Sequence, residues 1–325
     1  MLPKKLQDKI ETRAEEHSLR SLGLRQDLLD FSSNDYLGFS RSKKMYNKAC
    51  SILKQYNYQA NGATGSRLLT ANHPLYLDTE KQIATFHNTP TALIFNSGYD
   101  ANIGFFSSVP QRGDVILYDA LCHASIRDGI SMSHAKGYKF AHNNLQGLEA
   151  LLETQKKTNK TNAEIYVVTE AVFSMDGDIP PLKAVATLCK KHNAYLIVDQ
   201  AHATGVIGPK GKGLVQELDL EDLVFARIVT FGKALGCHGA AILGSGELKS
   251  YLINFARSFI YTTALPPHTL ATIGAAYSKL EDNSDAIKKL QDNISTLQKG
   301  ILDTQLTPYF IPSQSAIHCC VIKGN

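Results

Sequence analysis

The feature that most constrains the fold is an alternation, from residue 92 onward, of short apolar runs with helix-forming stretches. Repeated strand–helix units build a mostly parallel sheet with helices on both faces. The predicted strands are 92–95, 115–118, 165–168, 195–198, 227–230 and 240–243. The intervening helices are expected near 98–108, 121–132, 145–156 and 181–192. The predicted fold class is therefore α/β.

The segments that flank this pattern divide the chain into three parts. Residues 1–42 are predicted to form an N-terminal helix, over 4–17, and an arm rich in turn formers. The large domain is predicted to span 43–245, and its first helices are expected at 43–56 and 73–87. From 246 the pattern is mostly helical, at 248–257 and 267–301, and ends in a predicted strand at 316–325. Residues 246–325 would thus begin a smaller C-terminal α+β domain without completing it.

Composition excludes several classes of function. The chain has 325 residues, 43% of them apolar, which suits an ordinary globular protein with a large core. A net charge of +4, spread along the chain, disfavours nucleic-acid binding. No run approaches the ~20 apolar residues of a membrane span, and the start lacks the apolar core of a secretory signal. The six cysteines have neither Cys-x-x-Cys nor zinc spacing, so we expect no metal and a cytoplasmic location.

Two predicted strands end in groups that suit one cofactor. Asp199 ends one strand and is followed by His202, while Thr230 ends the next and is followed by Lys233. In open α/β sheets ligands bind at the carboxyl ends of strands, so we expect these groups at one crevice. Pyridoxal phosphate needs an acid for its ring nitrogen and a lysine for its aldehyde. His202 would suit its phenolic oxygen and Thr230 its phosphate; alternatively, Asp199 caps a helix and Lys233 is solvated.

Three further turns after predicted strands offer groups for the same crevice. The turn at 96–102, with Gly98 and Tyr99, suits either a phosphate or an ordinary helix N-cap. His123 offers a flat ring that can stack on a cofactor, although histidines at such positions also serve as caps or core residues. Ser174 lies in a polar loop and can donate a hydrogen bond.

Seven motifs, in this order, resemble those of the α-oxoamine synthases, a family of fold-type I pyridoxal phosphate enzymes. They are Asn-Asp-Tyr-Leu-Gly at 34–38, Gly-Ser-Arg-Leu-Leu-Thr at 65–70, Ser-Gly-Tyr-Asp-Ala-Asn at 97–102, the segment 119–125, Val-Phe-Ser-Met-Asp-Gly-Asp at 172–178, the segment 199–205 and Thr-Phe-Gly-Lys at 230–233. The motif at 261–267 extends the match. The motifs at 65–69 and 172–178 are most similar to those of members that condense L-alanine with pimeloyl-CoA in biotin synthesis.

The resemblance implies roles for individual residues. Lys233 would bind the cofactor covalently and move protons, Asp199 would pair with its ring nitrogen, and His123 would stack on its ring. Arg20 and His123 would contact the substrate. The family works as a homodimer with sites between subunits. The implied cofactor contacts are Gly98, Tyr99, His123, Ser174, Asp199, His202, Thr230 and Lys233.

Two features depart from the family, and two alternatives stay open. Gln200 stands where the family usually has an acid after the pyridine-binding aspartate. Family members also run on for several dozen residues beyond position 325, and that part normally supplies substrate contacts. Besides the alanine-dependent synthase, the chain suits a sister enzyme that uses glycine or serine, or a non-catalytic member that forms a dimer.

Overall fold

The computed structural model describes residues 2–23, 28–158, 163–282 and 284–322. Contacts divide the chain into two compact units, Met1–Ser33 and Asn34–Asn325. The first unit contains α1 (Lys4–Glu15), which buries none of its residues. A separate small domain starting at 246 stays a prediction.

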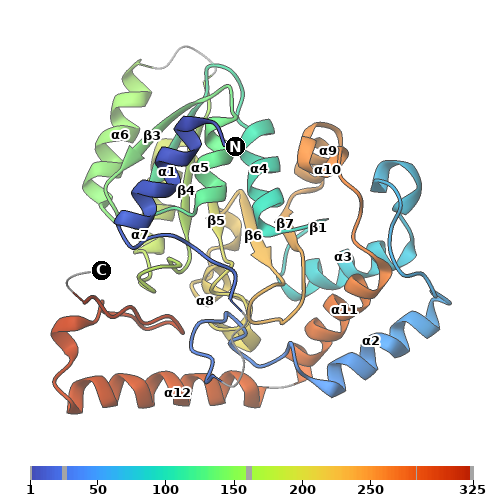
Figure 1. The fold of residues 1–325 in the computed structure, drawn as a ribbon. Helices are drawn as coiled ribbons and strands as arrows, with labels where there is room; N and C mark the ends of the chain where they lie inside the picture. Colours follow the sequence, from blue (N-terminus) through green and yellow to red (C-terminus); the bar gives the residue numbers. More distant parts are fainter. Residues whose placement is uncertain (1, 24–27, 159–162, 283, 323–325) are drawn as a thin grey trace. The chain divides into compact units, whose positions relative to one another are not determined.

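A mixed sheet forms the centre of the second unit (Figure 1). Within the described residues it has seven strands in the order β1-β7-β6-β5-β4-β2-β3. Among these, β7 alone runs antiparallel to its neighbours, so the predicted mostly parallel α/β sheet is confirmed. The strands are β1 (Thr91–Phe95), β2 (Val115–Asp119), β3 (Lys136–Phe140), β4 (Ile165–Glu170), β5 (Tyr195–Asp199), β6 (Ala226–Thr230) and β7 (Ala240–Gly244).

Helices cover both faces of the sheet. In the described part of the chain, none is long and apolar enough to cross a membrane. The helices of the second unit are α2 (Lys43–Gln55), α3 (Pro74–Phe86), α4 (Gly98–Ser108), α5 (Ala124–Ser131), α6 (Leu145–Thr158), α7 (Leu182–His192), α8 (Leu214–Glu217), α9 (Gly246–Phe255), α10 (Arg257–Ile260), α11 (Pro267–Asp282) and α12 (Ser284–Asp303).

The core follows the two-residue repeat of the strands. In β4, Tyr166 and Val168 pack with α4, α5, α9 and α10 on one face of the sheet. Ile165 and Val167 point to the other face and pack with α6 and α7. Successive side chains of a strand point to opposite faces, so a strand covered on both sides is apolar throughout. The predicted strands were recognisable for this reason.

Strand β3 was missed because it lacks an apolar run. Its sequence is Lys-Gly-Tyr-Lys-Phe, and only Phe140 is buried. It lies at the edge of the sheet and pairs only with β2 among the described strands. An edge strand buries few side chains, so its alternation is weak.

The C-terminal predictions need one correction. The helical pattern predicted at 267–301 is confirmed for the described residues, which belong to α11 and α12; residue 283 lies outside the described chain. The strand predicted at 316–325 is wrong for residues 316–322, which contain only an isolated bridge between Cys320 and Phe310; residues 323–325 lie outside the described chain. Two short segments that pair only with each other make a weak ladder.

A buried carboxylate ties three segments to the sheet. Glu80 of α3 is 2% exposed, and its Oε1 accepts the backbone N–H of Ile94 at 2.9 Å. The same carboxylate forms ion pairs with Arg67 and, at 2.8 Å, with Lys249. Both oxygens of the carboxylate therefore accept from donors, which a buried charge requires.

We expect Glu80→Ala to lower the free energy of unfolding by about 3 kcal/mol or more, because it leaves two cations without their partner in a buried setting. Urea unfolding measures the change. Glu149→Ala is the matched control, since the Glu149–Lys191 ion pair is exposed and should matter little. Equal stability of the two variants would contradict a structural role for Glu80.

Candidate functional site

A cavity of about 180 Å³ lies where β4, β5 and β6 end beside the start of α4. It brings together every predicted cofactor residue except Ser174. A larger hollow of about 420 Å³ lies beside α2 and α11, but its lining includes three lysines and one aspartate and contains no histidine. The lining of the smaller cavity is Gly98, Tyr99, Asn102, His123, Ser125, Glu170, Asp199, Ala201, His202, Thr230 and Lys233.

Asp199 forms the acidic end of the cavity. It is the last residue of β5 and is 5% exposed. Its Oδ1 accepts the backbone N–H of Ala201 at 2.9 Å, and its Oδ2 accepts from Nδ2 of Asn102 at 3.0 Å. These donors stabilise a carboxylate that β5 carries to the sheet edge.

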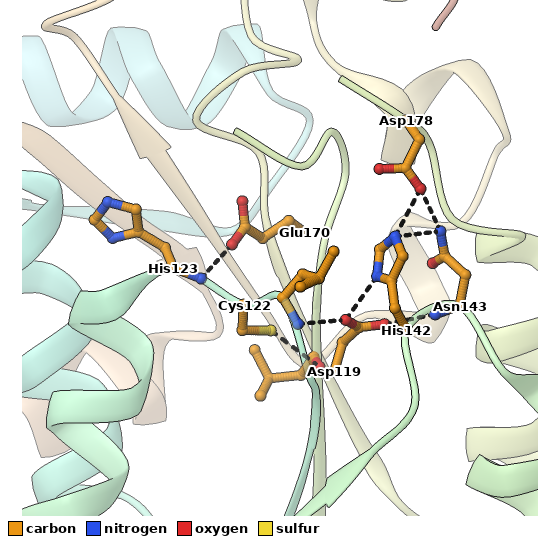
Figure 2. A network of polar contacts seen from close by, with 9 residues as sticks. Asp119, Cys122, His123, His142, Asn143, Glu170 and Asp178 are labelled. Carbon is orange, nitrogen blue, oxygen red and sulfur yellow. Dashed lines mark hydrogen bonds and ion pairs between the residues drawn. The ribbon is translucent and has the colours of Figure 1, made fainter. Parts of the chain in front are cut away.

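Glu170 lies beside Asp199 because β4 and β5 pair in parallel register. Burial, followed by the charge of Asp199, raises the pKa of Glu170 to about 8, so this carboxyl group is largely protonated at neutral pH. Its side chain accepts the backbone N–H of His123, as Figure 2 shows. Glu170 therefore fixes the start of α5 at the wall of the cavity.

Lys233 reaches the cavity at the end of a hydrogen-bonded chain. Its Nζ lies 2.6 Å from Nε2 of His202, and Nδ1 of His202 lies 2.8 Å from the hydroxyl of Tyr36. Burial and the Lys233 charge lower the pKa of His202 to about 3, so its ring is neutral. Burial also lowers the pKa of Lys233, against the opposing charges of Asp199 and Glu170. The site therefore favours the neutral, nucleophilic amine more than water does.

The opposite end of the cavity suits an anion. Helix α4 begins at Gly98, and Ser97 accepts the N–H of Asp100 at 3.0 Å. The amides of Gly98 and Tyr99 lie in the first turn, where a helix has no internal acceptors for its N–H groups. Thr230 lies nearby, since a Cβ at Gly98 would be 3.7 Å from its hydroxyl oxygen.

His123 caps α5 and presents its ring to the cavity. Its Nδ1 accepts the N–H of Ser125 at 3.2 Å and lies 2.8 Å from the Ser125 hydroxyl. Although the residue is exposed in the single chain, partial burial and the charge of Lys233 lower its pKa, and Asp199 opposes this shift. The ring is therefore neutral and open to a stacking partner.

A second polar network holds the loop that carries His123. Figure 2 shows His142 between two carboxylates, with Nδ1 2.8 Å from Asp119 and Nε2 2.8 Å from Asp178. Burial lowers the pKa of His142, but these hydrogen bonds outweigh it and the net pKa is raised. Asp176 also lies near His142 and Asp178, and one potential ligand atom from each of these three residues lies within 4.8 Å of the others. Because both ring nitrogens bond to carboxylates, His142 acts as a protonated donor.

Three residues singled out in the sequence lie outside the cavity lining. Ser174 lies on the loop after β4 and is partly buried, and its contact with the cofactor stays a prediction. Arg20 is exposed and belongs to the first unit, so its contact with substrate also stays a prediction. Gln200 is fully buried, and its Oε1 accepts the N–H of Val215 at 2.9 Å. Here the amide fixes the start of α8 to the end of β5.

Sequence reasoning missed four polar residues of the site: Tyr36, Asn102, Ser125 and Glu170. Tyr36 and Asn102 belong to the quoted motifs, but nothing in the motifs gave them a partner. Helical spacing could have found Asn102, because it comes four residues after Gly98 and so lies on the same face of α4. The pairing of Glu170 with Asp199 required the sheet register.

Comparisons with known proteins agree with this geometry. Residues 26–324 match the family model described as aminotransferase class I and II. An 8-amino-7-oxononanoate synthase of Emericella nidulans is 46% identical over 281 residues, which cover 83% of this chain and 67% of the relative. The chain thus spans about two thirds of that relative's length.

Solved structures of two related enzymes share the fold. The 8-amino-7-oxononanoate synthase of Francisella tularensis is 30% identical with a TM-score of 0.71, covering 86% of this chain and 77% of that chain. A serine palmitoyltransferase of Sphingomonas wittichii is 30% identical with a TM-score of 0.80, covering 88% and 70%. The chain therefore belongs to the aminotransferase class I and II family, in its α-oxoamine synthase branch of pyridoxal phosphate-dependent acyltransferases.

Proposed function

We propose that this enzyme condenses L-alanine with pimeloyl-CoA to give 8-amino-7-oxononanoate, CoA and carbon dioxide, a step of biotin synthesis. The observation that carries the proposal is the cavity that joins Lys233, Asp199 and His123. The choice of substrates is supported by the Emericella and Francisella relatives, which are synthases of that product. A serine-using sister reaction is the second candidate, because the Sphingomonas neighbour is a serine palmitoyltransferase.

The residues of the cavity fit pyridoxal phosphate, the cofactor of this family. Asp199 is buried, and among the described residues no cation lies in ion-pair contact with it. Such a carboxylate suits a protonated ring nitrogen, which would supply the missing positive charge. We assign the aldehyde to Lys233 and the phosphate to Thr230 with the first amides of α4. His123 is assigned to the face of the ring.

The chain's own groups perform the proton transfers and the positioning. When bound, the cofactor supplies an electron sink that makes the α-proton of an amino acid acidic. Lys233 removes this proton, and its lowered pKa favours the neutral amine that a base requires. His202, neutral and hydrogen-bonded to Tyr36, orients the Lys233 amine. His123 covers the cavity and limits the access of water to the reacting carbon.

We propose that the enzyme works as a homodimer in the cytoplasm. Four large apolar residues near the strand ends are exposed in the single chain, by 46%, 44%, 75% and 74%: Tyr99, Leu121, Met175 and Tyr261. Large apolar side chains exposed near a site in this way are common at interfaces. The six cysteines are free thiols, as in a reducing compartment.

Lys233→Ala should abolish CoA release while leaving the fold intact, because it removes the base and the cofactor's covalent partner. Asp199→Asn should retain some cofactor but lower turnover by orders of magnitude, since a neutral amide no longer stabilises a protonated ring nitrogen. A thiol assay of CoA release and circular dichroism measure the two properties. Near-normal turnover in either variant would remove that residue from its role.

The amino-acid substrate is tested by offering L-alanine, glycine and L-serine in turn with pimeloyl-CoA. We expect the highest kcat/KM for alanine, and product masses that match 8-amino-7-oxononanoate. A preference for glycine or serine, or for another acyl-CoA, would move the enzyme to a sister reaction. The Lys233→Ala variant is the control for CoA released without catalysis.

The dimer is tested by sedimentation. We expect a species of twice the chain mass, and we expect Met175→Glu with Tyr261→Glu to shift it toward the monomer, because two charges would enter an apolar interface. Lys299→Glu, on α12, is the control for an added charge. A monomeric wild-type protein that is active would contradict the shared site.

A further inference from the structure

Helices α4 and α5 approach each other closely beneath the cavity. A Cβ at Gly129 of α5 would lie 2.9 Å from the backbone oxygen of Asn102 and 3.2 Å from Cα of Ile103, so only glycine permits this packing. The approach brings Nδ2 of Asn102 within 3.0 Å of Oγ of Ser125. Asn102 is 2% exposed and Ser125 is 1% exposed. Their contact is therefore a buried one between two helices that begin at the site.

The hydrogen bonds of Asn102 have a fixed direction. Its side-chain amide donates one N–H to Oδ2 of Asp199 and the other to Ser125, each at 3.0 Å. The reversed amide would place its oxygen against the Asp199 carboxylate, which is repulsive. Both donors are thus committed, and in the described structure Oδ1 of Asn102 is buried without a partner. A buried polar atom left unpaired in this way is characteristic of a constrained site.

The tautomer of His123 follows from these directions. The backbone N–H of Ser125 donates to Nδ1 of His123 at 3.2 Å, so this nitrogen is an acceptor. The Ser125 hydroxyl accepts from Asn102 and lies 2.8 Å from the same Nδ1, to which it therefore donates its own proton. A neutral ring whose Nδ1 accepts carries its proton on Nε2.

We infer that Asn102 is a positioning residue for two groups at once: it orients the Asp199 carboxylate directly, and through the Ser125 hydroxyl it holds His123 in the Nε2-protonated form. His123 then offers the cavity a donor, which suits an anionic group such as the carboxylate of an amino acid. Both consequences rest on the proposed roles of Asp199 and His123 toward the cofactor.

Four charged residues also act on the His123 ring. Ser125→Ala leaves their contacts in place, whereas Asn102→Leu also removes a hydrogen bond from Asp199. Lys233 and Arg127 lower its pKa, whereas Asp199 and Asp128 raise it. None of these four residues donates to or accepts from Nδ1 in the described structure. A titration that changes on removal of Ser125 therefore reports the hydrogen bond between its hydroxyl and Nδ1 of His123, provided that the fold is kept.

The test is ¹⁵N NMR of the full chain, labelled at histidine and free of cofactor, with the His123 signals assigned by their loss in His123→Asn. In the wild type we expect the Nε2-protonated form. In Asn102→Leu the Ser125 hydroxyl no longer accepts a hydrogen bond from Asn102, so it can accept one from a protonated Nδ1 of His123. Ser125→Ala removes one of the hydrogen-bond donors to Nδ1. Each should raise the midpoint of the His123 titration by about one pH unit, the worth of one hydrogen bond.

The control is Ser107→Ala, which removes a hydroxyl from α4 that bonds only to the carbonyl of Ile103. An unchanged His123 tautomer and an unchanged midpoint of its titration in both Asn102→Leu and Ser125→Ala would overturn the inferred link from Asn102 through Ser125 to His123. Ser125→Ala decides the question if Asn102→Leu fails to fold. Because this measurement needs neither cofactor nor substrate, its failure is distinguishable from a failure of the proposed function.

The effect of Asn102 on Asp199 is measured separately, as the affinity of the protein for pyridoxal phosphate, which is followed by its visible absorption. Asn102→Leu should bind the cofactor about tenfold more weakly than Ser125→Ala does, because Asn102, unlike Ser125, donates to Asp199. Equal affinities in the two variants would remove Asp199 from the inference. Cofactor binding unchanged by Lys233→Ala and Asp199→Asn would instead contradict the proposed site.

Discussion

The burial of Asp199 at the end of β5 is the constraint on which the site depends. A buried carboxylate is costly unless donors surround it, and here the donors are two N–H groups with no cation in contact in the described chain. One of these donors belongs to Asn102 of α4, so the site requires α4 to be packed in place. The charge that remains is what a protonated cofactor ring would balance.

The parallel pairing of β5 with β4 and β6 places two further ionisable groups at the same edge of the sheet as Asp199. Glu170 pairs with Asp199 at the neighbouring strand end, and burial, followed by the charge of Asp199, raises the pKa of Glu170 to about 8. Lys233 follows β6, the next strand along, and its pKa is lowered by burial. Burial at one edge of the sheet thus shifts the pKa of two groups beside Asp199, raising that of Glu170 and lowering that of Lys233.

The sequence predicted the residues that end strands better than the residues that come from packing. Asp199, Thr230 and Lys233 were found because an apolar run stops next to them, and the ends of parallel strands share an edge. Asn102 and Ser125 were not, since their contact depends on the close approach of α4 and α5 at Gly129. Strand β3 was missed because it buries little.

We assign covalent binding of the cofactor to Lys233, with Asp199 at its ring nitrogen. Borohydride reduction of the protein loaded with pyridoxal phosphate, followed by peptide mass spectrometry, tests this assignment most directly. We expect the pyridoxyl group on Lys233, at about one group per chain. The group on another lysine, or spread over many lysines, would contradict the assignment of this cavity as the active site.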